Sequence, residues 1–241
     1  KVGLINPKGE IVLPPTYDVI KPFDGDFARV KNNDKWGIID KKGKLVVNAE
    51  YEESGDLFKN TAWARKGNEF GLVTANQFTV VEGADKIWDF HTEDITSARK
   101  AGKIGFIDLK GNWIIEPKFK KVKAFFKNLA PVDENGKWGY IDTKGAYVVE
   151  PAYDDAEVFG PDGLAPVKDK KWGFIDVAGK LVIPAKYDIT AASLTSMFKK
   201  SDKGFINGLA RVKSGSQWCF IKTNGEVLGG KSFKNAELFK K

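Results

Sequence analysis

The chain of 241 residues is 42% hydrophobic and 29% charged, which is typical of a folded protein with a sizeable core and excludes a disordered chain. Its apolar runs are only a few residues long, far short of the roughly 20 that cross a bilayer, so no transmembrane segment is predicted. A single histidine and a single cysteine exclude a histidine-based metal cluster and an internal disulfide. The formal net charge is +7, a surplus that can attract anionic partners.

A glycine recurs every 34 residues and divides the chain into repeats. The glycines are Gly3, Gly37, Gly71, Gly105, Gly139 and Gly173, and Cys219 takes the same place after an insertion of 12 residues. A fixed period of this length indicates a repeat architecture. We therefore expect one domain, residues 1–241, with seven units that start near residues 1, 35, 69, 103, 137, 171 and 217, and an insertion at about 189–203.

Each unit contains the same elements in the same order. In the second unit, short runs of aromatic and β-branched residues at 36–39 and 45–47 predict two strands. They flank an Asp-x-x-Gly turn at 40–43, where the carboxylate accepts backbone N–H groups and the glycine takes a positive φ. A strand of the type Ala-x-Val, such as 27–30, precedes them across the turn at Asn33 and Asp34. Each unit is thus predicted to be a three-stranded antiparallel meander.

The predicted strands do not alternate polar with apolar residues. The columns of Trp36, Ile38 and Ile39 are apolar in every unit, so both faces of each small sheet must be buried. Stacking on neighbouring units buries both faces. We expect the recurring glycine to be required because an aromatic side chain of the adjoining unit packs where a Cβ would collide.

The motif Lys-Trp-Gly-x-Ile-Asp-x-x-Gly, followed by tyrosine eight residues after the turn glycine, resembles the bacterial WG-repeat or KWG-repeat family. The resemblance covers essentially the whole chain. It implies an all-β tandem array of seven meanders, often secreted or attached to the cell envelope, with no shared catalytic site. Variable copy number in the family favours an open β-superhelix or solenoid, and the alternative is a closed propeller-like ring. No signal peptide opens the chain, although it begins within a repeat.

No catalytic residue, metal site or cofactor is predicted. The Gly-Lys pairs, such as Gly43-Lys44, lie in hairpin turns and lack the other residues of a phosphate loop. The repeated aspartates are explained by the turns that they precede, although paired acids or calcium ligands are the alternative. The protein is predicted not to be an enzyme, and a catalytic role for His91 is the rival interpretation.

Basic residues recur in two columns that flank one turn, so stacking would align them as a basic rim. The rim residues are Lys31, Lys35, Arg65, Arg99, Lys103, Lys137, Lys168, Lys171 and Lys213. Such a rim favours an anionic polymer or an acidic surface. The favoured interpretation, however, is that these lysines keep exposed strand edges from pairing with other chains. The sequence does not favour nucleic acid as a partner, because arginine is scarce and the tryptophans occupy apolar repeat positions.

Two regions depart from the repeat and are candidate partner-binding sites. In the third unit, Asp85 stands in the expected place of the tyrosine, and aromatic residues occur outside the standard positions. The insertion is the second region. The candidates are Trp63, Trp88, Phe90, His91, Met197, Phe198, Lys199 and Lys200. The alternatives are a decaying repeat in the first case and a decorative loop in the second.

These observations predict a non-catalytic repeat scaffold that mediates protein–protein or cell-envelope interactions. The first alternative is a module that binds a polyanion or glycan through the basic rim. An enzyme of unrecognised type is the second.

Overall fold

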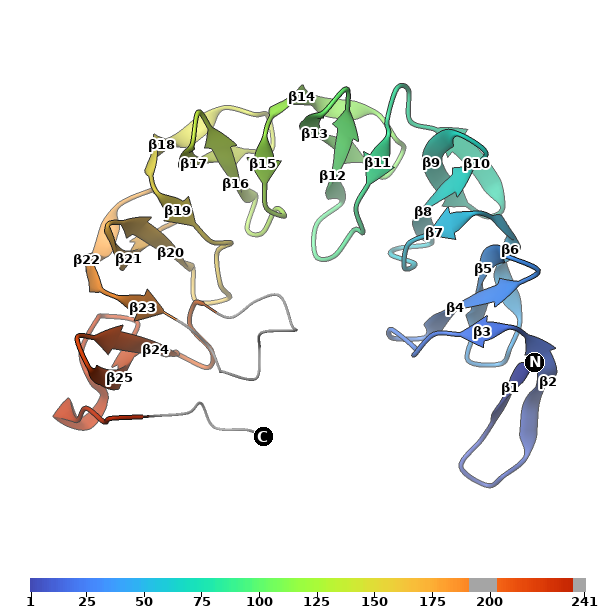
Figure 1. The fold of residues 1–241 in the computed structure, drawn as a ribbon, viewed down its shortest axis with the longest axis horizontal. Helices are drawn as coiled ribbons and strands as arrows, with labels where there is room; N and C mark the ends of the chain where they lie inside the picture. Colours follow the sequence, from blue (N-terminus) through green and yellow to red (C-terminus); the bar gives the residue numbers. More distant parts are fainter. Residues whose placement is uncertain (191–202, 236–241) are drawn as a thin grey trace. The chain divides into compact units, whose positions relative to one another are not determined.

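The computed structural model describes residues 1–190 and 203–235. The chain forms two compact units, Lys1–Lys118 and Phe119–Lys241. Both are built from small antiparallel sheets that follow one another along the chain (Figure 1). The described residues contain no α-helix, and none of their helical segments is long and apolar enough to span a membrane.

The first unit contains one two-stranded and three four-stranded sheets, each in sequential order. The strands are β1 (Val2–Ile5) and β2 (Ile11–Tyr17); β3 (Val19–Ile20), β4 (Phe27–Asn32), β5 (Lys35–Asp40) and β6 (Leu45–Tyr51); β7 (Glu53–Ser54), β8 (Thr61–Lys66), β9 (Glu69–Thr74) and β10 (Gln77–Val80); β11 (Lys86–Ile87), β12 (Ile95–Lys100), β13 (Lys103–Asp108) and β14 (Trp113–Phe119), whose last residue begins the second unit.

The second unit contains two four-stranded sheets and one three-stranded sheet. The strands are β15 (Lys121–Val122), β16 (Leu129–Glu134), β17 (Lys137–Asp142) and β18 (Tyr147–Tyr153); β19 (Asp155–Ala156), β20 (Leu164–Asp169), β21 (Lys171–Asp176) and β22 (Leu181–Tyr187); β23 (Ile189–Thr190), β24 (Leu209–Ser214) and β25 (Gln217–Lys222), followed by a 3-10 turn at Leu228–Gly230.

The predicted three-stranded meander is confirmed, and a two-residue strand precedes it. In the sheet β3–β6, β3 follows β2 of the preceding sheet after the single residue Asp18. The N–H of Asp18 donates to the carbonyl of Lys31, and the N–H of Lys21 donates to that of Arg29. Two residues are too few to produce a periodic pattern, so this strand has no signal in the sequence.

The core lies between successive sheets, as the apolar columns predict. In the first unit, Ile38, Val47 and Tyr51 of one sheet pack against Ala64 and Val73 of the next. The second unit repeats the arrangement between the sheet β19–β22 and the sheet β23–β25. Because a four-stranded sheet of this size cannot bury its own faces, its stability depends on its neighbours.

The explanation offered for the recurring glycine is wrong. In the second unit of the molecule, a Cβ at Gly139 would lie 2.4 Å from the carbonyl oxygen of Val149 on the paired strand of the same sheet. The register there pairs Trp138 with Tyr153 and Tyr140 with Val149, so β18 bulges toward the glycine. The glycine is therefore required by backbone within its own sheet.

The turn glycine is the one that contacts the adjoining sheet. Gly179 has a φ of +81°, and a Cβ there would lie 2.6 Å from Cγ2 of Val149 in the preceding sheet. Gly43 approaches Leu13 in the same manner. This glycine therefore serves the turn and the packing between sheets together.

Candidate functional site

The acid that follows the repeat tyrosine links three segments of the chain. Asp154 accepts a hydrogen bond from Lys137 Nζ at 2.6 Å and one from the backbone N–H of Lys170 at 3.0 Å. Lys137 belongs to the sheet before Asp154, and Lys170 to the turn between β20 and β21. The same three-way link joins Lys1, Asp18 and Asn33; Lys35, Glu52 and Gly67; and Lys171, Asp188 and Gly215.

The electrostatics of this link stabilise both charged groups. The hydrogen bonds from Lys137 and from the Lys170 N–H hold the pKa of Asp154 below its usual range. The same contact with Asp154 raises the pKa of Lys137. The first lysine of the Lys-Trp-Gly motif is therefore part of the structure that joins successive sheets.

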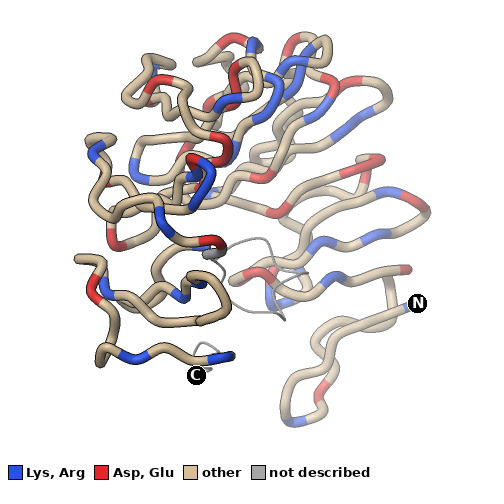
Figure 2. Tube along the Cα trace, turned by 60° about the vertical axis from the view of Figure 1, so that its left-hand side comes forward, with Lys and Arg blue, Asp and Glu red and all other residues tan. Residues whose placement is uncertain are grey.

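Most of the predicted basic rim is neutralised by acidic partners. Besides Lys35, Lys137 and Lys171, three rim residues form ion pairs of their own: Lys31 with Asp34, Arg65 with Glu53, and Arg99 with Asp85. Figure 2 shows basic and acidic residues interleaved along the trace. Lys103, Lys168 and Lys213 are the rim residues without an acid in ion-pair distance among the residues that the structure describes. The rim as a whole is therefore not a continuous positive stripe.

Trp63 joins two parts of the first unit. Its Nε1 donates a hydrogen bond of 2.8 Å to Asp89, which also accepts the backbone N–H of Asp56 at 3.0 Å. The indole lies over Gly55, where a Cβ would come within 2.2 Å of Nε1. Trp63 thus connects β8 to the loop between β11 and β12, and its polar atom is already bonded.

The interpretation of Phe90 as an off-pattern aromatic is wrong. The N–H of Asp85 bonds to the carbonyl of Arg99, as the N–H of Asp18 bonds to that of Lys31. Asp85 therefore corresponds to the acid after the tyrosine, and this repeat is one residue shorter than the 34-residue period implies. Phe90 consequently takes the standard aromatic position and is only 5% exposed.

The two other candidates of this loop reach the surface. Trp88 is half-buried, with Lys86 Nζ 4.7 Å from its ring centroid, and His91 is exposed. The candidates Met197, Phe198, Lys199 and Lys200 lie outside the described residues.

In four of the described sheets, the loop between the first two strands ends in a tight hairpin turn. Phe58 bridges to Thr61 across Lys59 and Asn60, whose φ values of 44° and 64° are those of a type I′ turn. Equivalent bridges start at Asp24 in the first unit and at Phe126 and Ile206 in the second. Within each unit these loops lie on one edge of successive sheets (Figure 1), which we call the loop edge.

A cluster of four charges supports the loop edge of the second unit. Glu157 lies between two lysines, 2.8 Å from Lys123 Nζ and 2.6 Å from Lys203 Nζ, and both lysines also contact Asp155. Burial alone lowers the pKa of Lys203, but its bond to Glu157 and the nearby acids raise it above the usual value. The cluster contains equal numbers of both charges and joins loops of three successive sheets.

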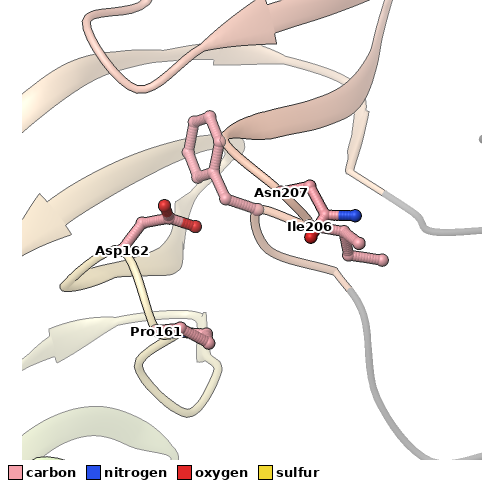
Figure 3. Close-up of a pocket in the computed structure, with 5 residues that line it drawn as sticks. Pro161, Asp162, Ile206 and Asn207 are labelled. Carbon is pink, nitrogen blue, oxygen red and sulfur yellow. The ribbon is translucent and has the colours of Figure 1, made fainter.

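A hollow of about 360 Å³ lies between two neighbouring loops of this edge. Pro161 and Asp162 of the loop before β20 line one side, and Phe205, Ile206 and Asn207 of the loop before β24 line the other (Figure 3). Phe205 is buried beneath it. The hollow combines apolar side chains with one carboxylate and one amide. The sequence alone does not indicate this hollow, because the two loops are about 45 residues apart and only the fold brings them side by side.

Two features bear on metal binding and on thiol chemistry. No group of three or more His, Cys, Asp or Glu side chains in residues 1–190 and 203–235 could hold a metal ion. Cys219 is buried, and burial raises the pKa of its thiol, which disfavours a reactive thiolate.

Comparison with known proteins identifies the repeat. The family described as WG containing repeat matches residues 3–36, 36–70, 104–138, 138–171 and 172–189, well over half of the chain. The crystal structure of a eukaryotic initiation factor is similar with a TM-score of 0.56 and 8% identity, over 95% of this chain and 70% of that one. Kluyveromyces lactis Hsv2p has a TM-score of 0.46 and 11% identity, over 86% and 74%. At these identities the likeness concerns the fold alone. No curated protein matches the chain.

Proposed function

Because the chain belongs to the family built from WG containing repeats, we propose that it is a non-catalytic scaffold whose loop edge binds another protein. The observation that supports this is that the motif residues of each repeat serve the fold, whereas the loop residues vary. The tryptophan, glycine, aspartate and tyrosine of the motif are used in turns, sheet packing and the links between sheets. The loop tips carry side chains that differ from one sheet to the next: Asp24, Phe58, Phe126, Pro161 and Ile206.

The hollow at Ile206 and Asp162 is the part of the loop edge with the clearest chemistry. Apolar walls next to a carboxylate suit an apolar side chain that is followed by a basic or hydrogen-bond-donating group. Proteins present such groups on exposed loops and extended segments. We therefore favour a protein partner over a polyanion. The acids that neutralise the basic rim weaken its attraction for a polyanion, and the carboxylate of Asp162 would repel one. A protein or polymer of the cell envelope remains our proposal for the biological setting.

The test is affinity capture from the native host with the wild-type chain and two matched variants. Ile206→Asp changes the hollow, whereas Leu181→Asp introduces the same charge at an exposed residue of β22. We expect a partner that is captured by the wild type and by Leu181→Asp and is lost with Ile206→Asp. Equal capture by all three forms would rule out the loop edge as the binding site.

The rival from another class is an enzyme that uses His91 or nearby acids. A panel of hydrolase substrates should give no turnover above background. Turnover that disappears with His91→Ala would contradict the non-catalytic assignment.

A further inference from the structure

Two cross-strand positions carry charged residues in nearly every sheet. The inner position lies where the first strand pairs with the second, and the outer position lies beside the turn between the second and third strands. In five of the six sheets with this hairpin, the directly opposed residues are opposite in charge or include a neutral residue. The inner pairs are Val19 with Lys31, Glu53 with Arg65, Lys121 with Asp133, Asp155 with Lys168, and Ile189 with Lys213. The outer pairs are Asn32 with Lys35, Lys66 with Glu69, Glu134 with Lys137, Asp169 with Lys171, and Ser214 with Gln217.

The sheet β11–β14 breaks this pattern at both positions. Lys86 lies opposite Arg99, and Lys100 lies opposite Lys103. Like charges directly opposite one another destabilise a sheet. Asp85 compensates Arg99. For the other three cations, no acid among the described residues lies within ion-pair distance.

Lys100 has lost an acid that its counterpart retains. In the neighbouring sheet, Lys66 Nζ contacts Glu50 Oε2 at 3.2 Å. The following repeat is one residue shorter, so Gly83 takes the position of Glu50 in that repeat. Lys100 lies over this glycine. A Cβ at Gly83 would be only 2.6 Å from Lys100 Cε. The lysine is therefore held against backbone where its equivalent meets a carboxylate.

Lys103 has lost its acid as well. In four other connections, the first lysine of the motif pairs with the acid after the tyrosine, as Lys137 pairs with Asp154. The residue at that place after Lys103 is Lys120 in the sequence. Ala101 and Gly102, with φ values of 50° and 76°, form the tight turn that keeps Lys100 and Lys103 opposed. A non-glycine residue at positive φ adds strain to a hairpin that already opposes like charges.

We propose that Lys100 and Lys103 form a binding site for an anionic oxygen group, a phosphate or a carboxylate, of an external ligand. A place where charge pairing and turn geometry are both unfavourable, with no nearby acid to offset the charges, is typical of a functional site. An anion between the two ammonium groups would replace the two missing carboxylates and gain charge-assisted hydrogen bonds. The lysines are exposed or half-buried, so an anion in solution reaches them.

This site is separate from the loop edge. Lys100 ends β12, whereas the loop before β12 lies at the other end of that six-residue strand, about 17 Å away. The two proposals therefore fail independently, since partner capture by the loop edge does not need the lysine pair.

The test is calorimetric titration of the whole chain at low ionic strength with tripolyphosphate and, separately, with poly-glutamate. Binding of one or both probes by the wild type is expected, and the comparison assigns the anion as phosphate, carboxylate or either. Lys100→Gln should weaken binding about tenfold, because a charge-assisted hydrogen bond is lost. Lys66→Gln removes the same charge at the equivalent position of the neighbouring sheet and should change the affinity less than about twofold, because Lys66 is already paired.

Lys103→Glu separates binding from folding. It should abolish anion binding and raise Tm, since it gives the hairpin the opposed charges found at Lys66 and Glu69. No binding of either probe by the wild type, or an equal loss in Lys66→Gln and Lys100→Gln, would overturn the proposal. A fall in Tm for Lys103→Glu would also contradict it, because the pair would then not be an uncompensated like-charge contact.

Discussion

Single residues of the repeat have roles that the motif alone does not distinguish. The glycine after the tryptophan lies under a bulged strand of its own sheet, whereas the glycine of the Asp-x-x-Gly turn has a positive φ and contacts the preceding sheet. The aspartate of the turn accepts two backbone N–H groups, which at Asp142 come from Lys144 and Ala146 at 2.9 Å each. Each residue type thus meets a requirement that another side chain would not satisfy.

Gly139→Ala should lower the free energy of unfolding by about 3 kcal/mol, because its Cβ would collide with the backbone of β18. Urea denaturation measures the change. Gly204→Ala is the matched control: its Cβ would meet nothing closer than 3.8 Å, and the expected change is within about 0.5 kcal/mol. Similar losses in both variants would show that backbone freedom, and not the close approach, sets the cost.

Glu52 should make stability depend on pH in the acid range. The hydrogen bond from Lys35 and backbone N–H groups, that of Gly67 among them, lower its pKa from 4.5 to about 2. A lowered folded-state pKa means that the stabilisation is complete above pH 4.5 and is lost as the pH falls toward 2. Glu52→Gln and Lys35→Met should both flatten the curve of Tm against pH in that window. A curve for either variant that runs parallel to the wild type would contradict the assignment.

At the scale of elements, the last strand of four sheets, β2, β6, β18 and β22, carries the register shift that admits the repeat glycine. The register shift is the same in β6, β18 and β22. Proline occupies the bulged position at Pro15, Pro117 and Pro151, and alanine occupies it at Ala49 and Ala185. A bulged residue makes no regular ladder bond, so proline is compatible there.

Ala49→Pro and Ala185→Pro should therefore each stabilise the protein by about 0.4–1 kcal/mol, chiefly by restricting the unfolded chain. Thermal and chemical denaturation both report the gain. Ala98→Pro, within β12 and paired on both sides, should instead cost about 3 kcal/mol or more. Destabilisation by the first two variants would mean that the N–H of the bulged residue is bonded.

At the scale of the whole molecule, each sheet is stabilised mainly by the sheets next to it. In the second unit, Phe174 is fully buried, and its ring centroid lies 5.0 Å from that of Phe205 in the loop before β24. Contacts of this kind connect nearest neighbours along the chain, which is the energetic arrangement of repeat proteins.

Phe174→Ala should lower stability by about 3–5 kcal/mol through the cavity that it leaves. Hydrogen exchange read by mass spectrometry should lose most protection in β20–β25 and less in β16, one sheet further away. Phe233→Ala, at a residue that is 43% exposed, should change little. Uniform loss of protection from β16 to β25 would show that this unit unfolds as one cooperative body.

The sequence by itself determined the repeat, the all-β class, the hairpin turns and the burial of both sheet faces. These follow from local residue types and a fixed period, which act within one unit. The tertiary structure decided which residues remain available for function. The one-residue shift that buries Phe90, the acids that neutralise the rim and the hollow at Ile206 all depend on contacts between segments that are far apart in the sequence. A column of lysines looks uniform along the chain, yet Lys137 pairs with Asp154 whereas Lys103 lies opposite Lys100, because the residues that meet each lysine are brought there by the fold.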